Sequence, residues 1–282
     1  MRIIRVPRRL NKIIKQIRSK RKTIGFVPTM GALHLGHLSL IKQAAEDNDI
    51  VVVSIFVNPA QFGPKEDLRK YPHPLKEDFR LCREAGVALV FLPDTEIIYP
   101  QGFSTFVDVG GLSSLLCGVS RPGHFRGVAT IVAKLLNIVG PDALYLGQKD
   151  AQQAVIIARM IKDLNFPVKV KIMPTLREND GLAASSRNAY LNKEQRIQAQ
   201  VLFKALSLAG SLIDNGQRDC ARIIGRMRQL IDKKKQAKID YIAIVDLENL
   251  KPLKRVSGRY LIALAVKIGK TRLIDNLKGE VC

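Results

Sequence analysis

The residues best suited to catalysis are two histidines three positions apart. His34 and His37 lie in the stretch PTMGALHLGH, residues 28–37, between an apolar run and an amphipathic one. A strand-to-helix turn is expected there, with free backbone N–H groups and the positive end of the helix dipole directed at a crevice, which favours phosphate. Imidazole N–H groups could donate to charge developing on a phosphate as pyrophosphate leaves. The chemistry indicated is attack on the α-phosphate of a nucleotide.

Two other interpretations of the histidine pair stay open. Histidines can ligate zinc, but no Cys is near, and the next acidic residues, Glu46 and Asp47, follow about two and a half turns later. Both rings could instead serve only in packing or at the surface. The chain has four histidines and two of them stand here, which favours a functional role.

Polar residues also follow the second and fourth apolar runs of the chain. Gln61 offers a donor and an acceptor to a small polar substrate, although a loop glutamine can equally be solvated. Lys149 would neutralise phosphate charge, and Asp150 could orient it or accept a hydrogen bond from a ribose. A Lys-Asp pair that opens a helix is otherwise often solvated. In a parallel sheet such residues belong to the ligand edge, at the carboxyl ends of the strands.

A polar segment beyond the parallel strands carries Ser185, Ser186 and Arg187. Two hydroxyls and a guanidinium suit the β and γ phosphates of a nucleotide, because arginine can bind them bidentately. A loop at this place could close over a nucleotide and expel water. The alternative is an ordinary linker between domains.

Three further residues are weaker candidates. His124 and Arg126 stand at the start of an expected helix, which is either a second anion position or a structural feature. Asp78 could help to hold a magnesium ion, or could be solvated on an exposed helix. The metal ligands therefore stay unassigned.

Alternating apolar and amphipathic stretches predict the elements that position these residues. The expected strands cover residues 23–29, 50–57, 87–92, 143–146 and 168–173, and the helices between them cover 36–47, 75–85, 125–138 and 151–163. This alternation is typical of a Rossmann-like, doubly wound parallel sheet.

The pattern changes after residue 174. A polar segment, 177–192, precedes a long helix over 193–214 and a second over 220–233, followed by strands at 240–245, 260–266 and 271–276. The fold class predicted is α/β, with a nucleotide-binding domain over residues 1–176 and a smaller α+β lid domain over residues 177–282.

Composition excludes several classes of protein. The 282 residues are 46% hydrophobic and 25% charged, without low-complexity bias and without an apolar run long enough to span a membrane. Four dispersed cysteines, Cys82, Cys117, Cys220 and Cys282, indicate reduced thiols and a cytoplasmic protein.

The net charge of +21 raises the question of a polyanion partner. The basic excess is spread along the chain, and aromatic residues are few, which argues against nucleic acid as the main ligand. Ten of the first 22 residues are Lys or Arg. We interpret this stretch as a surface helix that includes Ile3, Ile4 and Leu10, rather than as a targeting peptide.

The motifs resemble those of a known family. The stretch from residue 25 to 37 contains a sequence similar to the H-x-G-H signature of the nucleotidyltransferase superfamily. The whole stretch resembles the corresponding sequence of the pantothenate synthetase (pantoate–β-alanine ligase) family. Four further blocks match that family in the same order: IFVNPAQFG (55–63), RPGHFRGV (121–128), LGQKDAQQ (146–153) and residues 177–188. The resemblance covers nearly all of residues 23–192.

The resemblance implies an enzyme, an AMP-forming ligase that condenses (R)-pantoate with β-alanine through a pantoyl adenylate, with ATP as substrate, Mg²⁺ and a homodimeric assembly. It implies catalytic roles for His37, His34, Lys149 and Arg187, pantoate binding by Gln61 and Gln153, and β-alanine binding by Gln61. The ATP site that it implies consists of Met30, Gly31, Ala32, Leu33, His34, Leu35, Gly36, His37, Gly147, Gln148, Lys149, Asp150, Leu176, Ala184, Ser185, Ser186 and Arg187. The alternatives are another adenylyl-transferring enzyme and a basic nucleic-acid-binding protein.

Overall fold

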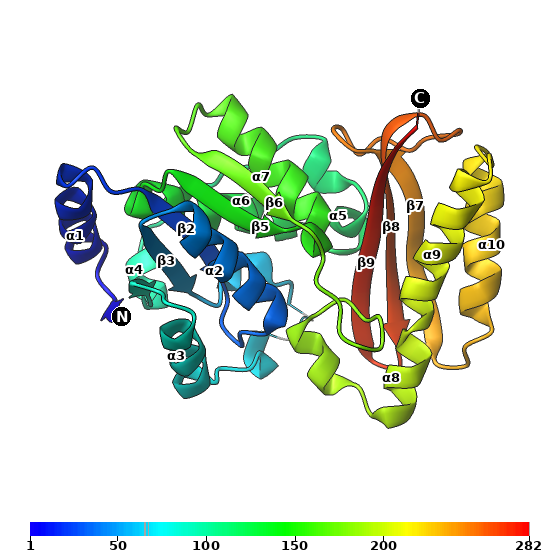
Figure 1. Ribbon diagram of the computed structural model, residues 1–282, viewed down its shortest axis with the longest axis horizontal. Helices are drawn as coiled ribbons and strands as arrows, with labels where there is room; N and C mark the ends of the chain where they lie inside the picture. Colours follow the sequence, from blue (N-terminus) through cyan, green and yellow to red (C-terminus); the bar gives the residue numbers. More distant parts are fainter. Residues whose placement is uncertain (65, 67, 282) are drawn as a thin grey trace. The chain divides into compact units, whose positions relative to one another are not determined.

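The computed structural model describes residues 1–64, 66 and 68–281. The chain divides into two compact units (Figure 1). Unit 1 comprises Met1–Ser114, Gly118–Gly147 and Ile156–Pro174, and unit 2 comprises Leu115–Cys117, Gln148–Val155 and Thr175–Cys282.

Unit 1 is built on a parallel sheet of six strands in the order β1-β4-β3-β2-β5-β6. The strands are β1 (Arg2–Ile4), β2 (Ile24–Thr29), β3 (Ile50–Ile55), β4 (Leu89–Phe91), β5 (Ala143–Gly147) and β6 (Lys169–Met173). The chain runs from β2 outward to β4 on one side and then crosses to β5 and β6 on the other. This order is that of a doubly wound sheet, so the predicted fold class is confirmed.

Helices connect these strands. They are α1 (Pro7–Ser19), α2 (Leu35–Asp47), α3 (Leu75–Glu84), α4 (Thr95–Ile98), α5 (Cys117–Ser120), α6 (His124–Val139) and α7 (Ala151–Asp163). Val27 and Val53 on neighbouring strands pack with Ile41 of α2 and Cys82 of α3 in one buried cluster. Because side chains alternate along a strand, Phe26 points to the opposite face, and α6 contacts both β2 and α1.

The N-terminus differs from the prediction. Ile3 and Ile4 lie in β1, which pairs in parallel with β4, and the helix begins only at Pro7. Proline is favoured in the first turn of a helix because it needs no hydrogen-bond partner for its nitrogen. The helical expectation is correct for Leu10, which is buried in α1 together with Ile13 and Ile14.

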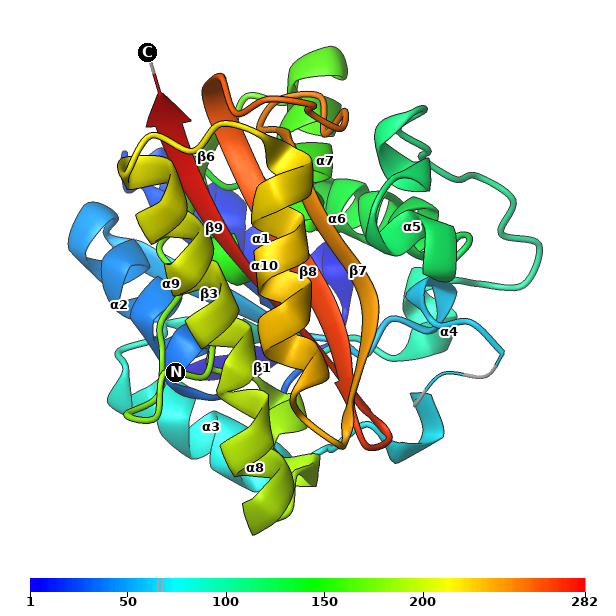
Figure 2. The same ribbon diagram turned by 90° about the vertical axis from the view of Figure 1, so that its right-hand side faces the viewer.

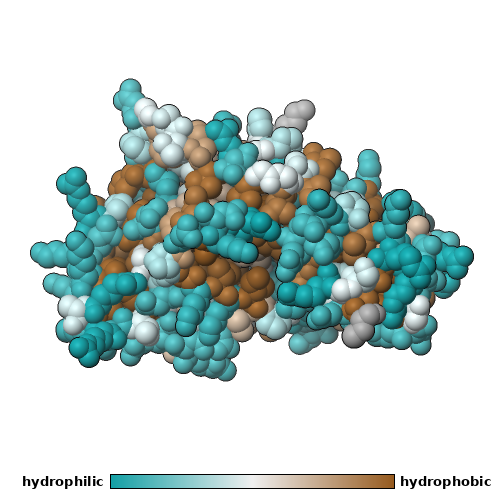
Figure 3. Space-filling view, turned by 90° about the horizontal axis from the view of Figure 1, so that it is seen from above, coloured by the Kyte–Doolittle hydropathy of each residue, from teal (hydrophilic) through white to brown (hydrophobic). Residues whose placement is uncertain are grey.

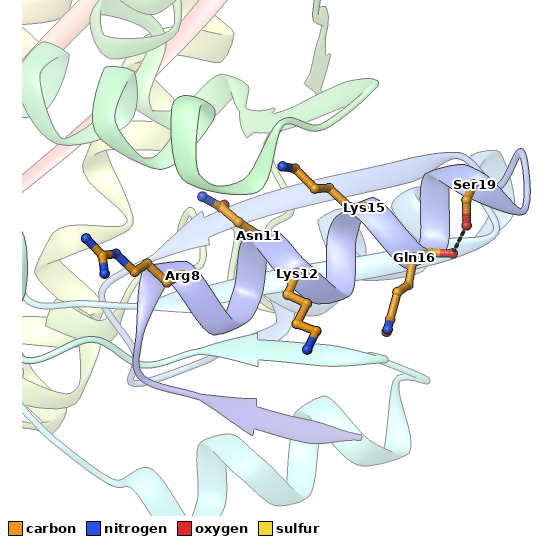
Figure 4. Close-up of a pocket in the computed structure, with 6 residues that line it drawn as sticks. All are labelled: Arg8, Asn11, Lys12, Lys15, Gln16 and Ser19. Carbon is orange, nitrogen blue, oxygen red and sulfur yellow. Dashed lines mark hydrogen bonds between the residues drawn. The ribbon is translucent and has the colours of Figure 1, made fainter.

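The outward face of α1 is strongly basic. Arg8, Asn11, Lys12 and Lys15 project from it, and with Gln16 and Ser19 they line a surface hollow of about 490 Å³ (Figure 4). None of these side chains is among the predicted site residues. Hydrophilic side chains likewise cover much of the molecular face in Figure 3, with apolar side chains between them.

Unit 2 holds an antiparallel sheet of β7 (Ala237–Asp246), β8 (Gly258–Ile268) and β9 (Thr271–Val281). Figure 2 shows α9 (Val201–Asp214) and α10 (Cys220–Asp232) side by side across one face of this sheet. Their apolar faces and β8 share one core, which contains Leu206, Ile223 and Leu264. The predicted smaller α+β fold is confirmed.

The long helix expected over residues 193–214 is two helices, α8 (Lys193–Ala199) and α9. Gln200 lies between them with φ −56° and ψ −19°, values closer to a 3-10 turn than to an α-helix. Apolar periodicity continues across this residue, so the pattern could not reveal the break.

Three cysteines, Cys82, Cys117 and Cys220, are buried thiols that form no disulfide, and Cys282 lies outside the described residues. Burial raises the pKa of the Cys82 thiol to about 12, which keeps it protonated at neutral pH. Within the described ranges, no helix combines the length and the apolar character needed to cross a membrane.

Helix α6 approaches the 3-10 helix η1 (Pro59–Gln61) so closely that only glycine fits at residue 127. A Cβ atom there would lie 2.2 Å from the Ala60 carbonyl oxygen and 2.7 Å from the Gln61 nitrogen. Both neighbouring atoms belong to the backbone, so no side-chain rotation could relieve the clash.

We therefore expect Gly127→Ala to lower the free energy of unfolding by about 1–3 kcal/mol, because the backbone must shift to admit the methyl group. The matched control is Gly225→Ala in α10, where nothing lies within 4 Å of the added Cβ. Alanine is the better helix former, so this control should raise stability by about 0.5–1 kcal/mol. Urea unfolding of both variants checks the opposite signs, and equal effects would contradict the close approach.

Candidate active site

The carboxyl ends of β2 and β5 mark the point where the strand order of the sheet reverses. From β2 the chain continues to one side of the sheet, and β5 begins the other side. In open α/β sheets ligands bind in the crevice outside such a switch point. The histidine stretch follows β2, and the GQKD stretch begins with Gly147, the last residue of β5.

Both histidines cap the first turn of α2. His34 is the N-cap, and its Nδ1 accepts a hydrogen bond from the Gly36 N–H at 3.2 Å. The Nδ1 atom of His37 accepts from the His34 N–H at 3.3 Å, and the two ring centroids lie 4.0 Å apart. Because each Nδ1 is an acceptor, each neutral ring carries its proton on Nε2. The capping hydrogen bonds therefore make Nε2 the donor atom of each ring.

The same geometry argues against the zinc interpretation. Coordination through Nε2 would require the proton on Nδ1, where it would face a backbone N–H. In the part of the chain that the structure describes, no group of three His, Cys, Asp or Glu side chains could hold a metal ion.

Several backbone N–H groups of this turn have protein partners, in contrast to the expectation that they are free. The Gly31 N–H donates to the Thr29 hydroxyl at 3.1 Å. The N–H groups of Ala32 and Leu33 donate to the two carboxylate oxygens of Asp78, at 3.0 and 2.7 Å. Protein groups thus occupy three of the amides that were expected to face a phosphate.

Asp78 itself is not a solvated helix residue. It lies in the first turn of α3 and is 0% exposed. Burial, the main cause, raises the pKa of its carboxyl group, while the hydrogen bonds from Leu33 and Ala32 act in the opposite direction. Because both oxygens face backbone amides, the carboxylate is not directed at a crevice as a metal ligand would be.

Gln61 is held by buried polar neighbours. Its Oε1 accepts from Asn58 Nδ2 at 3.0 Å, and its Nε2 approaches the Met30 sulfur at 3.2 Å. Asn58 also donates to the Gly127 carbonyl and accepts from the Tyr99 hydroxyl at 2.7 Å. Burial raises the pKa of Tyr99 to about 12, so the hydroxyl stays protonated and donates. The Gln61 amide is therefore oriented with its NH₂ group as the donor.

His124 supports the Gln61 backbone and is not a free anion site. Its Nε2 accepts from Arg121 at 2.9 Å, so its Nδ1–H donates to the Gln61 carbonyl at 2.7 Å. Arg121 in turn forms a two-point ion pair with Glu66, at 2.7 and 2.6 Å. Burial alone would raise the pKa of Glu66, but the hydrogen bonds and charge of Arg121 lower it. Arg126 lies over the Phe106 ring at 4.0 Å.

In unit 2, the 3-10 helix η4 (Gln148–Asp150) is fixed by Asn276 of β9. Asn276 Nδ2 donates to the backbone carbonyls of Gln148 and Lys149, and its Oδ1 accepts from the Gln148 side chain at 2.9 Å. The Lys149 ammonium lies 3.5 Å from an Asp150 oxygen, a long contact for an ion pair.

The polar segment 177–192 is anchored by ion pairs, unlike a simple linker. Arg177 donates to both oxygens of the buried Asp275, at 2.6 and 3.0 Å. Arg196 bonds both Glu178 and Asp180, and the buried Asn188 donates to Glu178 at 2.6 Å.

These anchors hold the short 3-10 helix η5 (Ser186–Tyr190). Ser185 is its N-cap, with its hydroxyl accepting from the Arg187 N–H at 3.3 Å. The backbone of Ala184 bonds that of Leu176 at 2.9 Å, which brings two of the predicted ATP-binding residues together.

The predicted site residues thus fall into two groups. Unit 1 holds Met30, Gly31, Ala32, Leu33, His34, Leu35, Gly36, His37, Gln61 and Gly147. Unit 2 holds Gln148, Lys149, Asp150, Gln153, Leu176, Ala184, Ser185, Ser186 and Arg187.

The residues that support these groups, chiefly Asn58, Tyr99 and Asn276, could not be predicted from the sequence. Each is a polar residue whose partner is distant in the sequence, and nothing in the local pattern identifies such a partner.

Comparison with known proteins agrees with the motif resemblance. The family model described as pantoate-beta-alanine ligase matches residues 2–278. The pantothenate synthetase of Fervidobacterium nodosum is 53% identical over 277 residues, covering 98% of this chain and 99% of the relative. The pantothenate synthetase of Moorella thermoacetica is 54% identical over 264 residues, covering 94% and 93%.

Solved structures give the same result. The pantothenate synthetase of Thermus thermophilus superposes with a TM-score of 0.93 at 44% identity, covering 98% of this chain and 99% of that one. The pantoate-beta-alanine ligase of Francisella tularensis, complexed with beta-gamma ATP and beta-alanine, gives 0.81 at 36% identity, covering 98% and 97%. The chain belongs to the pantoate–β-alanine ligase family.

Proposed function

We propose that this pantothenate-forming ligase works in two steps through a pantoyl adenylate. In the first step an oxygen of the pantoate carboxylate attacks the α-phosphorus of ATP, and the bond to pyrophosphate breaks. In the second step the β-alanine amine attacks the pantoyl carbonyl carbon, AMP leaves with the electron pair of the broken bond, and the amine loses a proton. The mixed anhydride supplies a good leaving group that a carboxylate lacks.

One observation carries this mechanism: two histidines cap one helix start through Nδ1, at the switch point of the sheet, so that each ring carries its proton on Nε2. Charge builds on the phosphate oxygens as pyrophosphate leaves, and fixed N–H donors stabilise that charge. Neutral imidazoles suit this task because they need no protonation change to donate. We assign this role to His37 and His34. The Francisella tularensis complex with beta-gamma ATP and beta-alanine supports the choice of substrates.

The remaining site residues would bind and orient the substrates. Lys149 and Arg187 would hold the triphosphate, with the backbone and side chains of the other predicted ATP-binding residues around it. Gln61 and Gln153 would position pantoate, and Gln61 would also contact β-alanine. The buried neighbours of Gln61 support this role, because they fix its NH₂ group as a donor for a carboxylate or hydroxyl oxygen.

Magnesium would enter as the complex with ATP. Mg²⁺ keeps several waters and binds mainly through substrate phosphates and one or two carboxylates. Among the residues that the structure describes, the acidic groups form no larger ligand set, which fits a metal carried by the nucleotide. Its chemistry would be to neutralise phosphate charge.

The larger organisation follows from the family and is part of the same proposal. We place substrate binding and adenylation in residues 1–176 and a covering role in residues 177–282. A cytoplasmic homodimer is expected, and light scattering of the purified protein would show its mass.

Pyrophosphate exchange tests the first chemical step. We expect labelled pyrophosphate to enter ATP in the presence of pantoate and Mg²⁺ without β-alanine, because adenylation is reversible before the amine arrives. Omission of pantoate gives the background rate. Exchange that requires β-alanine, or none at all in folded enzyme, would contradict an adenylate intermediate.

Substitution of His37 tests the source of phosphate stabilisation. We expect His37→Ala to lower the exchange rate by about 100-fold or more, since one oxyanion donor is removed. His73→Ala is the matched control, because His73 is an exposed histidine outside the predicted site, and it should exchange at the wild-type rate. A normal rate for His37→Ala would remove His37 from the chemistry.

A further inference from the structure

Asp78 is the buried charge that the mechanism above does not use. Its carboxylate is 0% exposed, and its partners are the N–H groups of Ala32 and Leu33, in a segment 45 or more residues away in the chain. Burying a carboxylate is unfavourable unless hydrogen bonds stabilise its charge. The two hydrogen bonds therefore join the Asp78 carboxylate to the turn before α2.

The turn itself adopts a conformation that needs support. Gly31 has φ +80° and Ala32 has φ +50°. The left-handed region is unfavourable for residues with a side chain, so Ala32 would relax if its contacts were lost. Asp78 also fits tightly against the other side of the turn, because a Cβ on Gly31 would lie 2.9 Å from its Oδ2.

The turn leads directly into the histidine caps. His34 follows Leu33, whose N–H is bound by Asp78 Oδ1 at 2.7 Å. A change in the backbone at Ala32 and Leu33 would move the N-cap, and the hydrogen bonds that hold each Nδ1 would change with it. Asp78 also accepts hydrogen bonds from two N–H groups that would otherwise compete with the imidazoles for a phosphate oxygen.

We propose that Asp78 is a positioning residue for adenylation: its carboxylate fixes the turn over residues 30–33 so that His34 and His37 present Nε2–H to the reacting phosphate. The inference rests on the proposed function of the two histidines. It differs from a role in metal binding, because both carboxylate oxygens are turned to the backbone.

The test is Asp78→Asn, which keeps the shape but sets an NH₂ group against one backbone N–H. We expect kcat of pantoate-dependent pyrophosphate exchange to fall about 10- to 100-fold, as small misplacements of catalytic groups do. KM for pantoate should stay within about two-fold, because Asn58 holds the Gln61 Oε1 from outside this turn, and only the Gln61 contact with the Met30 sulfur depends on the turn.

Two-bond ¹H–¹⁵N spectra of the imidazoles supply a readout independent of turnover. In the wild type, His34 and His37 should show an unprotonated Nδ1 and a protonated Nε2, and Asp78→Asn should mix the tautomers. The chain has four histidines, so assignment is simple. If wild-type enzyme fails to exchange pyrophosphate, the proposed function fails, but these spectra still test the effect of Asp78 on the rings.

Glu77→Gln is the matched control, since Glu77 is the neighbouring carboxylate, exposed and paired with Arg80 at 2.6 Å. It should keep wild-type kcat and spectra. If Asp78→Asn does not fold, Gly31→Ala disturbs the same turn with the carboxylate in place and should give the same losses. Wild-type kcat or unchanged imidazole spectra in the folded variants would overturn the proposal. So would recovery of Asp78→Asn at raised Mg²⁺, which would indicate a metal ligand.

Discussion

The hydrogen bonds between two imidazole rings and the first turn of α2 are the interaction on which the rest of the site depends. A helix start leaves backbone N–H groups without partners, and here the side chains of His34 and His37 accept from them. The bonds that stabilise the helix also select the ring tautomer. Fold and chemistry therefore share one set of contacts, and a change in either changes the other.

The supports around this helix show how a buried polar group is made specific. Thr29 and Asp78 hold the turn before α2, and Asn58 orients the Gln61 amide with help from the Tyr99 hydroxyl. In each case, hydrogen bonds from neighbouring residues fix the conformation of a flexible segment or the orientation of a side-chain amide. Such assignment is possible only where water is excluded, because water would accept or donate in any direction.

Much of this architecture could be predicted from the sequence. Apolar periodicity located the strands that became β2, β3 and β5, and the HLGH stretch identified the residues at the start of α2. Periodicity failed for β1, because Ile3 and Ile4 also fit the spacing of the basic helix that follows. It also failed to place the partners of Asp78, because contacts between distant segments leave no trace in local spacing. For the same reason, the expectation of free amides was wrong at Ala32 and Leu33.

The tautomers of His34 and His37 also determine which kind of inhibitor can bind at this turn. A small molecule directed at this turn meets hydrogen-bond donors from both rings, since each Nδ1 is already engaged by the backbone. Inhibitors should therefore present acceptor atoms such as sulfonyl or phosphoryl oxygens to the imidazoles. Compounds that offer an amine or hydroxyl hydrogen there would have to displace a helix cap, and their affinity would suffer accordingly.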